Sequence, residues 1–165
     1  MRLLVVCLAL VAVLAPAAAA APKRADTGLA NELEREVVQR VNALRAERGL
    51  PAVRIVDTLV QAARRHSRAM ISHDEFSHES PANGEAFDRR IRRFHQARLL
   101  GETLGWGSGA YGTPAGVVEL WLDSPPHRAI LLDRAFARIG VGLARGTFQG
   151  VAGASVWTAD FASAR

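Results

Sequence analysis

The chain has 165 residues, with 21 lysines and arginines against 16 acidic residues and a formal net charge of +5. Once an N-terminal leader is set aside, about 140 residues remain, which is the size of one ordinary domain. Arginines alternate with acidic residues along the chain, so its charge favours a solvated surface over a continuous basic binding block.

The N-terminus has the pattern of a secretion signal over residues 1–21. Met1-Arg2 is a short positive region, Leu3 to Leu14 is apolar, and the small residues from Ala17 to Ala21 suit signal-peptidase cleavage. The apolar run is shorter than the roughly 20 residues of a membrane-spanning helix, so a retained anchor is the lesser alternative. We therefore expect a protein that is secreted or retained in the cell envelope, with no transmembrane anchor in the mature chain and no nucleic-acid partner.

Cys7 is the only cysteine of the chain, and it lies inside this leader. The mature chain should therefore contain no thiol and no disulfide, although the exported compartment permits them. Its stability must come from an apolar core, which a domain of about 140 residues can supply. We expect a monomer whose folding does not depend on a reducing agent.

Four helices are predicted from apolar residues at helical spacing. Asp57 is a predicted N-cap, Thr113-Pro114 supply an N-cap and a first-turn proline, Gly49-Leu50-Pro51 end one helix, and Pro125-Pro126 break another. After a structureless lead-in at 22–30, the predicted helices run from Asn31 to Gly49, Asp57 to Ser72, Ala86 to His95 and Thr113 to Ser124.

The strands are predicted mainly at the end of the chain. Ile139 to Ala144 and Val151 to Phe161 are suited to an antiparallel hairpin with a turn at Gly146 to Gly150. Gly105 to Gly112 is predicted as a loop or irregular strand, because it lacks the lysine and the strand-to-helix setting of a phosphate-binding loop. Helices followed by a hairpin predict an α+β fold in one domain from 31 to 165.

The densest basic group is predicted to be a solvated helix surface, with weak affinity for an acidic envelope polymer or anionic lipid as the alternative. These arginines fall on the helix faces that apolar residues leave open. The group consists of Arg89, Arg90, Arg92 and Arg93.

The histidines fall into two groups. His66 lies on the apolar face of its helix and is predicted to be a hydrogen-bonded core or boundary histidine rather than a ligand. His73 and His95 follow helix ends, where a cation is favoured. His78 and His127 instead lie among turn-forming residues near or beyond the ends of predicted helices.

Glu102 occupies a similar position to those two histidines, so the three groups invite a shared site. Two imidazoles and a carboxylate can bind a divalent ion such as zinc, perform acid–base chemistry, or form a polar cluster that holds loops together. Ser124 lies three residues before His127 but lacks the flanking glycines of a nucleophile elbow.

An ordered set of motifs from about Glu34 to Phe161 resembles the CAP superfamily, which groups cysteine-rich secretory proteins, antigen 5 and plant pathogenesis-related class 1 proteins. The chain resembles the compact bacterial, SCP-like branch. The motifs are Val41-Asn42-Ala43-Leu44-Arg45 through Gly49-Leu50-Pro51, Ala62-Ala63 through Met70, Phe76-Ser77-His78, Gly101-Glu102-Thr103, Trp121-x-x-Ser124-Pro125-x-His127-Arg128, and Ile139-Gly140-Val141-Gly142.

The resemblance implies a three-layer α-β-α sandwich with a central antiparallel sheet and a cleft where histidines and acidic residues converge. His78, Glu102 and His127 match the family's cleft positions. Ser124 takes a fourth position, which is often glutamate in eukaryotic members. Glu119 does not substitute for it, because the helix directs this side chain elsewhere.

Family members are linked to sterol or lipid binding, to metal-dependent behaviour, to cell-wall association and to proteolysis, and the fold alone does not choose among these. We expect a non-enzymatic binding domain for a lipid, an envelope component or a protein, with a zinc-like ion held by His78, His127 and Glu102. The alternatives are a metal-assisted hydrolase with Glu102 as base, and a structural domain whose cluster only holds loops.

Overall fold

The computed structural model describes residues 30–164, so the expected signal peptide (1–21) and nearly all of the lead-in (22–30) lie outside the described residues. Helices and strands alternate irregularly along this part. In chain order the elements are α1 (Glu32–Ala46), β1 (Arg54–Ile55), α2 (Asp57–His73), α3 (Phe87–Arg92), β2 (Leu100–Gly107), the 3-10 turn η1 (Gly109–Gly112), α4 (Pro114–Asp123), α5 (Pro125–Leu131), β3 (Phe136–Phe148) and β4 (Val151–Ser163).

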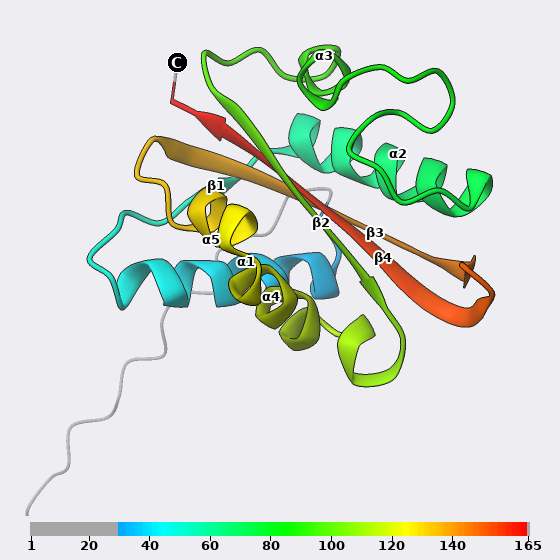
Figure 1. The fold of residues 1–165 in the computed structure, drawn as a ribbon. Coiled ribbons are helices and arrows are strands. Elements are labelled where there is room, and N and C mark those ends of the chain that lie inside the picture. The colour runs from blue at the N-terminus through cyan, green and yellow to red at the C-terminus, as the bar shows by residue number, and fades with distance from the viewer. Residues whose placement is uncertain (1–29, 165) are drawn as a thin grey trace, which may run out of the picture.

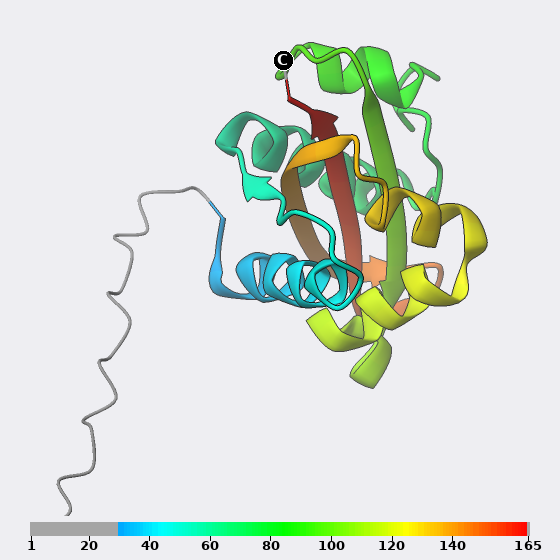
Figure 2. The same ribbon diagram turned by 90° about the vertical axis from the view of Figure 1, so that its left-hand side faces the viewer.

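These elements form three layers, as Figures 1 and 2 show. The four-stranded sheet has the order β1-β3-β4-β2 and lies between α2 and α3 on one face and α1, α4 and α5 on the other. β4 pairs antiparallel with both β3 and β2, and only the two-residue β1 is parallel to its neighbour. The α+β class and the α-β-α sandwich are therefore confirmed.

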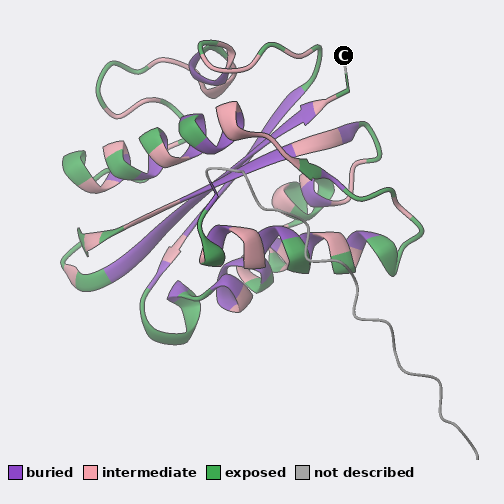
Figure 3. Ribbon diagram, turned by 180° about the vertical axis from the view of Figure 1, so that it is seen from behind, coloured by how far each residue is buried: buried purple, intermediate pink, exposed green. Residues whose placement is uncertain are grey.

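Both faces of the sheet carry an apolar core, so β2 and β4 are buried along most of their length (Figure 3). On the α1/α4 face the largest cluster joins Val41 and Trp121 to Ile139 and Trp157. On the other face, Met70 of α2 belongs to a separate cluster. No helix between residues 30 and 164 has the length and apolarity that crossing a membrane requires.

α1 forms where the sequence predicts it. Asn31 is its N-cap and takes part in a capping box, since its side chain accepts from the Glu34 amide while the Glu34 carboxylate accepts from the Asn31 amide. Gly49 follows the helix with a φ of +65°, a conformation that favours glycine. α2 begins at Asp57 itself, with Val56 as the N-cap, so the predicted capping role of Asp57 is wrong by one position.

Two glycines of β3 allow α2 to lie directly on the sheet. A Cβ atom at Gly140 would stand 2.1 Å from the Leu59 carbonyl carbon, and one at Gly142 would stand 2.2 Å from the Arg64 nitrogen. Both contacts are with the backbone of α2, which cannot relieve a clash by changing rotamer as a side chain can. The Ile139-Gly-Val-Gly142 motif therefore sets how closely the second layer approaches the sheet.

Other predicted boundaries need correction. The predicted hairpin is confirmed, but β3 and β4 each have 13 residues, and the chain turns at Gln149 and Gly150, where φ is positive. The third helix is shorter than the predicted span, since α3 covers only Phe87–Arg92. The glycine-rich segment enters strand β2, and Pro125-Pro126 ends α4 but also begins α5, in line with the preference for proline in the first helical turn.

Candidate functional site

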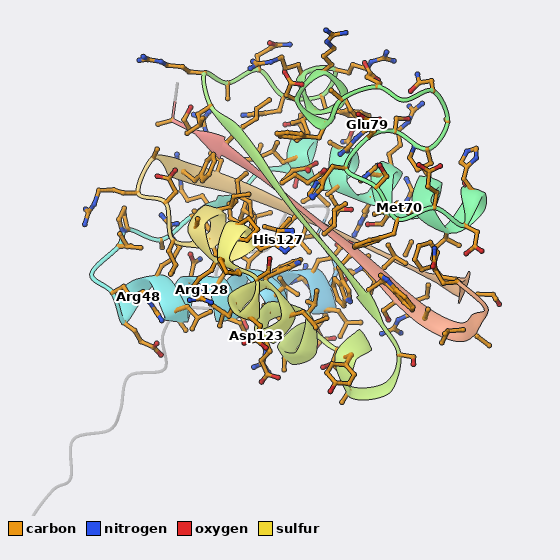
Figure 4. All side chains as sticks on the ribbon, viewed as in Figure 1. Arg48, Met70, Glu79, Asp123, His127 and Arg128 are labelled. Atoms are coloured by element: carbon orange, nitrogen blue, oxygen red, sulfur yellow. The ribbon has the colours of Figure 1, made fainter. Side chains whose placement is uncertain are left out.

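His78, Glu102 and His127 line one cleft, although they come from three different elements. His78 lies in the loop between α2 and α3, and Glu102 lies on β2. His127, which is labelled in Figure 4, lies in the first turn of α5, beside β2. The predicted loop positions of Glu102 and His127 are therefore wrong. The two imidazole ring centroids are 6.0 Å apart, and His78 Nδ1 is 2.8 Å from Glu102 Oε1.

The hydrogen bond to Glu102 determines how His78 can act. A carboxylate only accepts, so Nδ1 of His78 donates the proton and Nε2 keeps its lone pair in the neutral ring. The His78 side chain is 48% exposed, so that lone pair is accessible from the cleft. Burial and the neighbouring His78 lower the pKa of His127, with Glu102 opposing, so this second imidazole is held toward its neutral form.

Arg90 of α3 holds the other oxygen of Glu102, through an ion pair between Nη2 and Oε2. Both side chains are buried, at 6% and 2% residue exposure. The prediction that Arg90 belongs to a solvated surface is therefore wrong. The arginine is buried because Glu102 lies in the sheet beneath α3, and a carboxylate in the interior needs an opposite charge.

A second buried carboxyl group, Asp160 of β4, lies beside Glu102 in register across the strands. Its burial and the charge of Glu102 raise the pKa of Asp160 well above its usual range, with Arg90 opposing. Burial alone would raise the pKa of Glu102 as well, but the His78 hydrogen bond and the Arg90 charge hold it below its ordinary value. The surroundings therefore favour the neutral form of Asp160 beside the charged form of Glu102.

The cleft itself has a volume of about 540 Å³, and most of its wall is apolar. Gly101 forms part of the floor, where an added Cβ would stand 2.7 Å from the Phe136 ring and 3.2 Å from the Ile130 side chain. Glycine before Glu102 therefore lets the wall close over the strand. The apolar lining includes Phe87, Leu99, Leu100, Ile130 and Phe136.

Arg45 of α1 fixes the segment that follows α5 and forms this wall. Its side chain is fully buried, and its guanidinium donates to the carbonyl oxygens of Leu131, Asp133 and Phe136 at 2.8, 3.0 and 3.1 Å. A further bond of 2.9 Å goes to the Pro51 carbonyl. A single side chain therefore ties α1 to the turn between α5 and β3.

Ser124 does not line the cleft. It is the C-cap residue of α4 and the N-cap residue of α5, and it is not among the residues that line the cleft. Within residues 30–164, no cluster of three or more histidine, cysteine, aspartate and glutamate side chains is arranged to hold a metal ion. The geometry agrees with that finding, since both oxygens of Glu102 already have partners.

The remaining histidines lie outside the cleft. His66 is buried, as predicted, and its Nε2 lies 2.8 Å from the Ser77 carbonyl oxygen. Nδ1 of His95 lies 3.0 Å from the Thr58 hydroxyl, while His73 is an exposed residue in the last turn of α2. Arg90 and Asp160 are the site residues that the sequence reasoning missed, because their partner Glu102 is distant in sequence.

Comparison with known proteins places the chain in a family. The model of the cysteine-rich secretory protein family, CAP, matches residues 38–161. The uncharacterized protein YkwD of Bacillus subtilis is 34% identical over 128 residues, covering 78% of this chain and 46% of YkwD. The uncharacterized membrane protein YlbC of the same organism is 29% identical over 112 residues, or 68% of this chain and 32% of YlbC. The chain thus spans less than half of each of these relatives.

Solved structures show the same fold at low sequence identity. An extracellular protein of Bacillus anthracis that contains an SCP domain has a TM-score of 0.68 and 24% identity, over 79% of this chain and 40% of that one. An outer surface protein of Borrelia burgdorferi has a TM-score of 0.66 and 21% identity, over 84% of this chain and 99% of that one. Because the family model covers most of the chain, including the cleft residues, the protein belongs to the cysteine-rich secretory protein (CAP) family.

Proposed function

We propose that this chain is a secreted, non-enzymatic binding module whose cleft takes an amphiphilic ligand of the lipid type. The supporting observation is the composition of the cleft, which combines a long apolar wall with His78, Glu102 and His127. Apolar pockets with a few convergent polar groups are the usual form of small-molecule sites. The leader pattern at 1–21 and the extracellular or surface descriptions of the similar solved structures support secretion.

The polar head of the ligand would meet the two imidazoles, directly or through a divalent ion. His78 is suited to a metal because its Nδ1 donates to Glu102, the arrangement by which carboxylates orient metal-binding histidines. Two imidazoles on one tetrahedral zinc ion have centroids about 5 Å apart, and the observed separation is 6.0 Å. Glu102 then acts through His78, and solvent or the ligand head completes the coordination.

A hydrolase receives less support from the same geometry. A general base must be free to take a proton, whereas Glu102 is ionised, fully engaged by His78 and Arg90, and has a lowered pKa. Ser124 lies outside the cleft lining, and its side chain makes no capping hydrogen bond at the start of α5. Release of product from peptide, ester or envelope substrates, lost in His78→Ala, would overturn the binding assignment in favour of the hydrolase.

We expect Leu99→Gln to weaken binding of a single-chain fatty acid about tenfold, since burial of a leucine side chain is worth about 1.5–3 kcal/mol. Leu99 lines the cleft yet is 40% exposed, so the change should leave the fold intact. Tyr111→Gln, at an exposed aromatic residue outside the cleft, is the matched control. Calorimetric titration decides, and equal affinities of the two variants would contradict the proposed cleft.

Zinc binding should require both cleft histidines. Imidazole must be neutral to coordinate, so protons compete, and affinity should fall as the pH drops below the ordinary histidine value of about 6.5 toward the lowered pKa of His127. His78→Ala and His127→Ala should each lose zinc affinity sharply, whereas His95→Ala should keep it, because His95 is bonded to Thr58 elsewhere. Calorimetry at two pH values tests this, and an unchanged affinity in the double His78→Ala, His127→Ala variant would exclude a shared site.

A further inference from the structure

One end of the sheet carries a row of arginines. At this end, at the upper left of Figure 1, β2 and β3 begin and β4 ends in its arrowhead. Arg138 of β3 is in register with Arg54 of β1 on one side and with Ala162 of β4 on the other. Ala162 is in turn in register with Leu100 of β2. Because neighbouring strands lie about 4.8 Å apart, these positions form one line across the sheet.

Arg98 extends this line just before β2 begins. The next residue, Leu99, is bonded to Ser163 of β4, since its amide donates to the Ser163 hydroxyl at 3.2 Å and its carbonyl accepts from the Ser163 amide at 3.0 Å. The guanidinium of Arg138 donates to the Ser163 carbonyl at 3.4 Å. Contacts with one residue of β4 therefore hold Arg138 and the segment of Arg98 at the same end of the sheet.

The charges of these arginines are not compensated by the protein. Between residues 30 and 164, no ion pair involves Arg54, Arg98 or Arg138. The carboxylates of the same segments are partly buried and already have partners; they are Asp57, Asp88 and Asp133. Like charges on neighbouring strands in register cost free energy. A positive end of this kind is therefore suited to an anionic partner outside the chain.

The same end carries an exposed apolar side chain, that of Leu99. The residue is 40% exposed and also lines the histidine cleft, so it lies at the mouth of that cleft. Basic residues around an exposed apolar residue are typical of proteins that bind anionic membrane surfaces. The basic groups bind the headgroups there, and the apolar residue reaches the boundary of the acyl chains.

We propose that this arginine end, defined by Arg54, Arg98, Leu99 and Arg138, docks on the surface of an anionic lipid bilayer. The guanidinium groups donate to headgroup phosphates, whose geometry they match. Leu99 contacts the acyl boundary, and the mouth of the cleft faces the membrane. The docking goes beyond the proposed binding of an amphiphile in the cleft and does not require it.

Two features favour a bilayer over a soluble acidic polymer. A polymer would satisfy the arginines but would leave Leu99 in water, whereas a bilayer accommodates both. The opposite end of the sheet carries exposed carboxylates, because Asp74 accepts from the Gln149 amide of the hairpin turn and Glu75 follows it. An anionic surface would repel that end, so the charge distribution orients the molecule with the arginine end toward the membrane.

Co-sedimentation of the full mature chain with vesicles tests the docking, at low and at high salt and without added metal. Vesicles of phosphatidylcholine alone are compared with vesicles that also contain phosphatidylglycerol. We expect binding only to the anionic vesicles and its loss at high salt, because salt screens exposed charges. Equal binding to both kinds of vesicle, or none to the anionic vesicles at low salt, overturns the proposal. Soluble polyphosphate that binds as tightly as the anionic vesicles would assign the surface to an acidic polymer instead.

Double variants then locate the surface. Arg54→Gln with Arg98→Gln should weaken binding to anionic vesicles about 25-fold, since each basic residue near such a surface contributes about fivefold. Arg68→Gln with Arg145→Gln is the matched control, because it removes the same charge from exposed positions of α2 and of β3 near the hairpin turn. Thermal melts verify folding. Equal losses in the two double variants would show a response to net charge alone and refute the assigned surface.

Titration with a single-chain fatty acid separates this proposal from the function of the cleft. The Arg54→Gln, Arg98→Gln variant should keep the affinity of the parent for the monomeric fatty acid, because neither arginine lines the cleft. A parent that binds the fatty acid but not anionic vesicles would overturn the docking and leave the cleft function standing. A parent that binds anionic vesicles but not the fatty acid would support the docking and contradict the cleft function.

Discussion

Replacement of Trp121 by alanine is expected to lower the free energy of unfolding by about 3–5 kcal/mol. The indole is fully buried on α4, in the main core cluster with Val41 and Trp157. Its Nε1 also donates to the Leu104 carbonyl at 2.9 Å, so the side chain joins α4 to strand β2. Alanine would leave a cavity and remove that bond together.

Denaturant unfolding of the parent and the variant measures this loss. Tyr111→Ala is the control, because Tyr111 is 64% exposed and its truncation should change the free energy by less than about 0.5 kcal/mol. Trp121→Phe should fall between the two, since it keeps most of the volume but loses the hydrogen bond. A Trp121→Ala midpoint close to that of Tyr111→Ala would show that α4 does not pack on the sheet in this orientation.

Arg45→Met should destabilise the fold by a similar amount, about 3–5 kcal/mol, because it removes the charged donor shared by four buried or partly buried carbonyl groups. Methionine keeps much of the length and apolar stem of arginine, so the effect reports mainly the lost hydrogen bonds. Arg45→Lys should recover only part of the loss, since an ammonium cannot span the same spread of acceptors.

Arg48→Met provides the matched control for this experiment. Arg48 lies just beyond the end of α1, has a 45% exposed side chain, and is labelled near the end of that helix in Figure 4. The same substitution there should cost less than about 0.5 kcal/mol. If denaturant melts give equal losses for the two variants, the buried guanidinium does not fasten the turn after α5.

Sequence patterns predict those helices and strands whose ends are determined by neighbouring residues. Asn31 and Gly49 bracket α1 through a capping box and a positive φ, and both effects depend on neighbouring residues only. Strand β2 escapes prediction because both of its faces are covered, so no alternation of polar and apolar residues marks it. The glycines at positions 101, 105 and 107 further weaken the strand pattern.

The cleft also depends on contacts between residues that are distant in the sequence. The convergence of His78, Glu102 and His127 was expected from the ordered motifs of a family, since nothing in their spacing brings three separate segments together. Helix periodicity predicted a surface position for Arg90. Such a pattern contains no information about Glu102, the ion-pair partner that lies on a strand 12 residues later in the sequence. Ser124 matched a family position in sequence yet lies at a helix junction outside the cleft lining.

The contacts of Arg45 also bear on how the chain folds. Its bonds to Leu131, Asp133 and Phe136 connect positions that are 86 to 91 residues apart, so they form only when α1 meets the junction of α5 and β3. Closing such a loop costs entropy before any contact compensates it, and folds rich in distant pairings reach the native state slowly. The N-terminal helix can therefore acquire its turns before Arg45 makes these long-range contacts. Contacts that form after the transition state act chiefly by slowing unfolding.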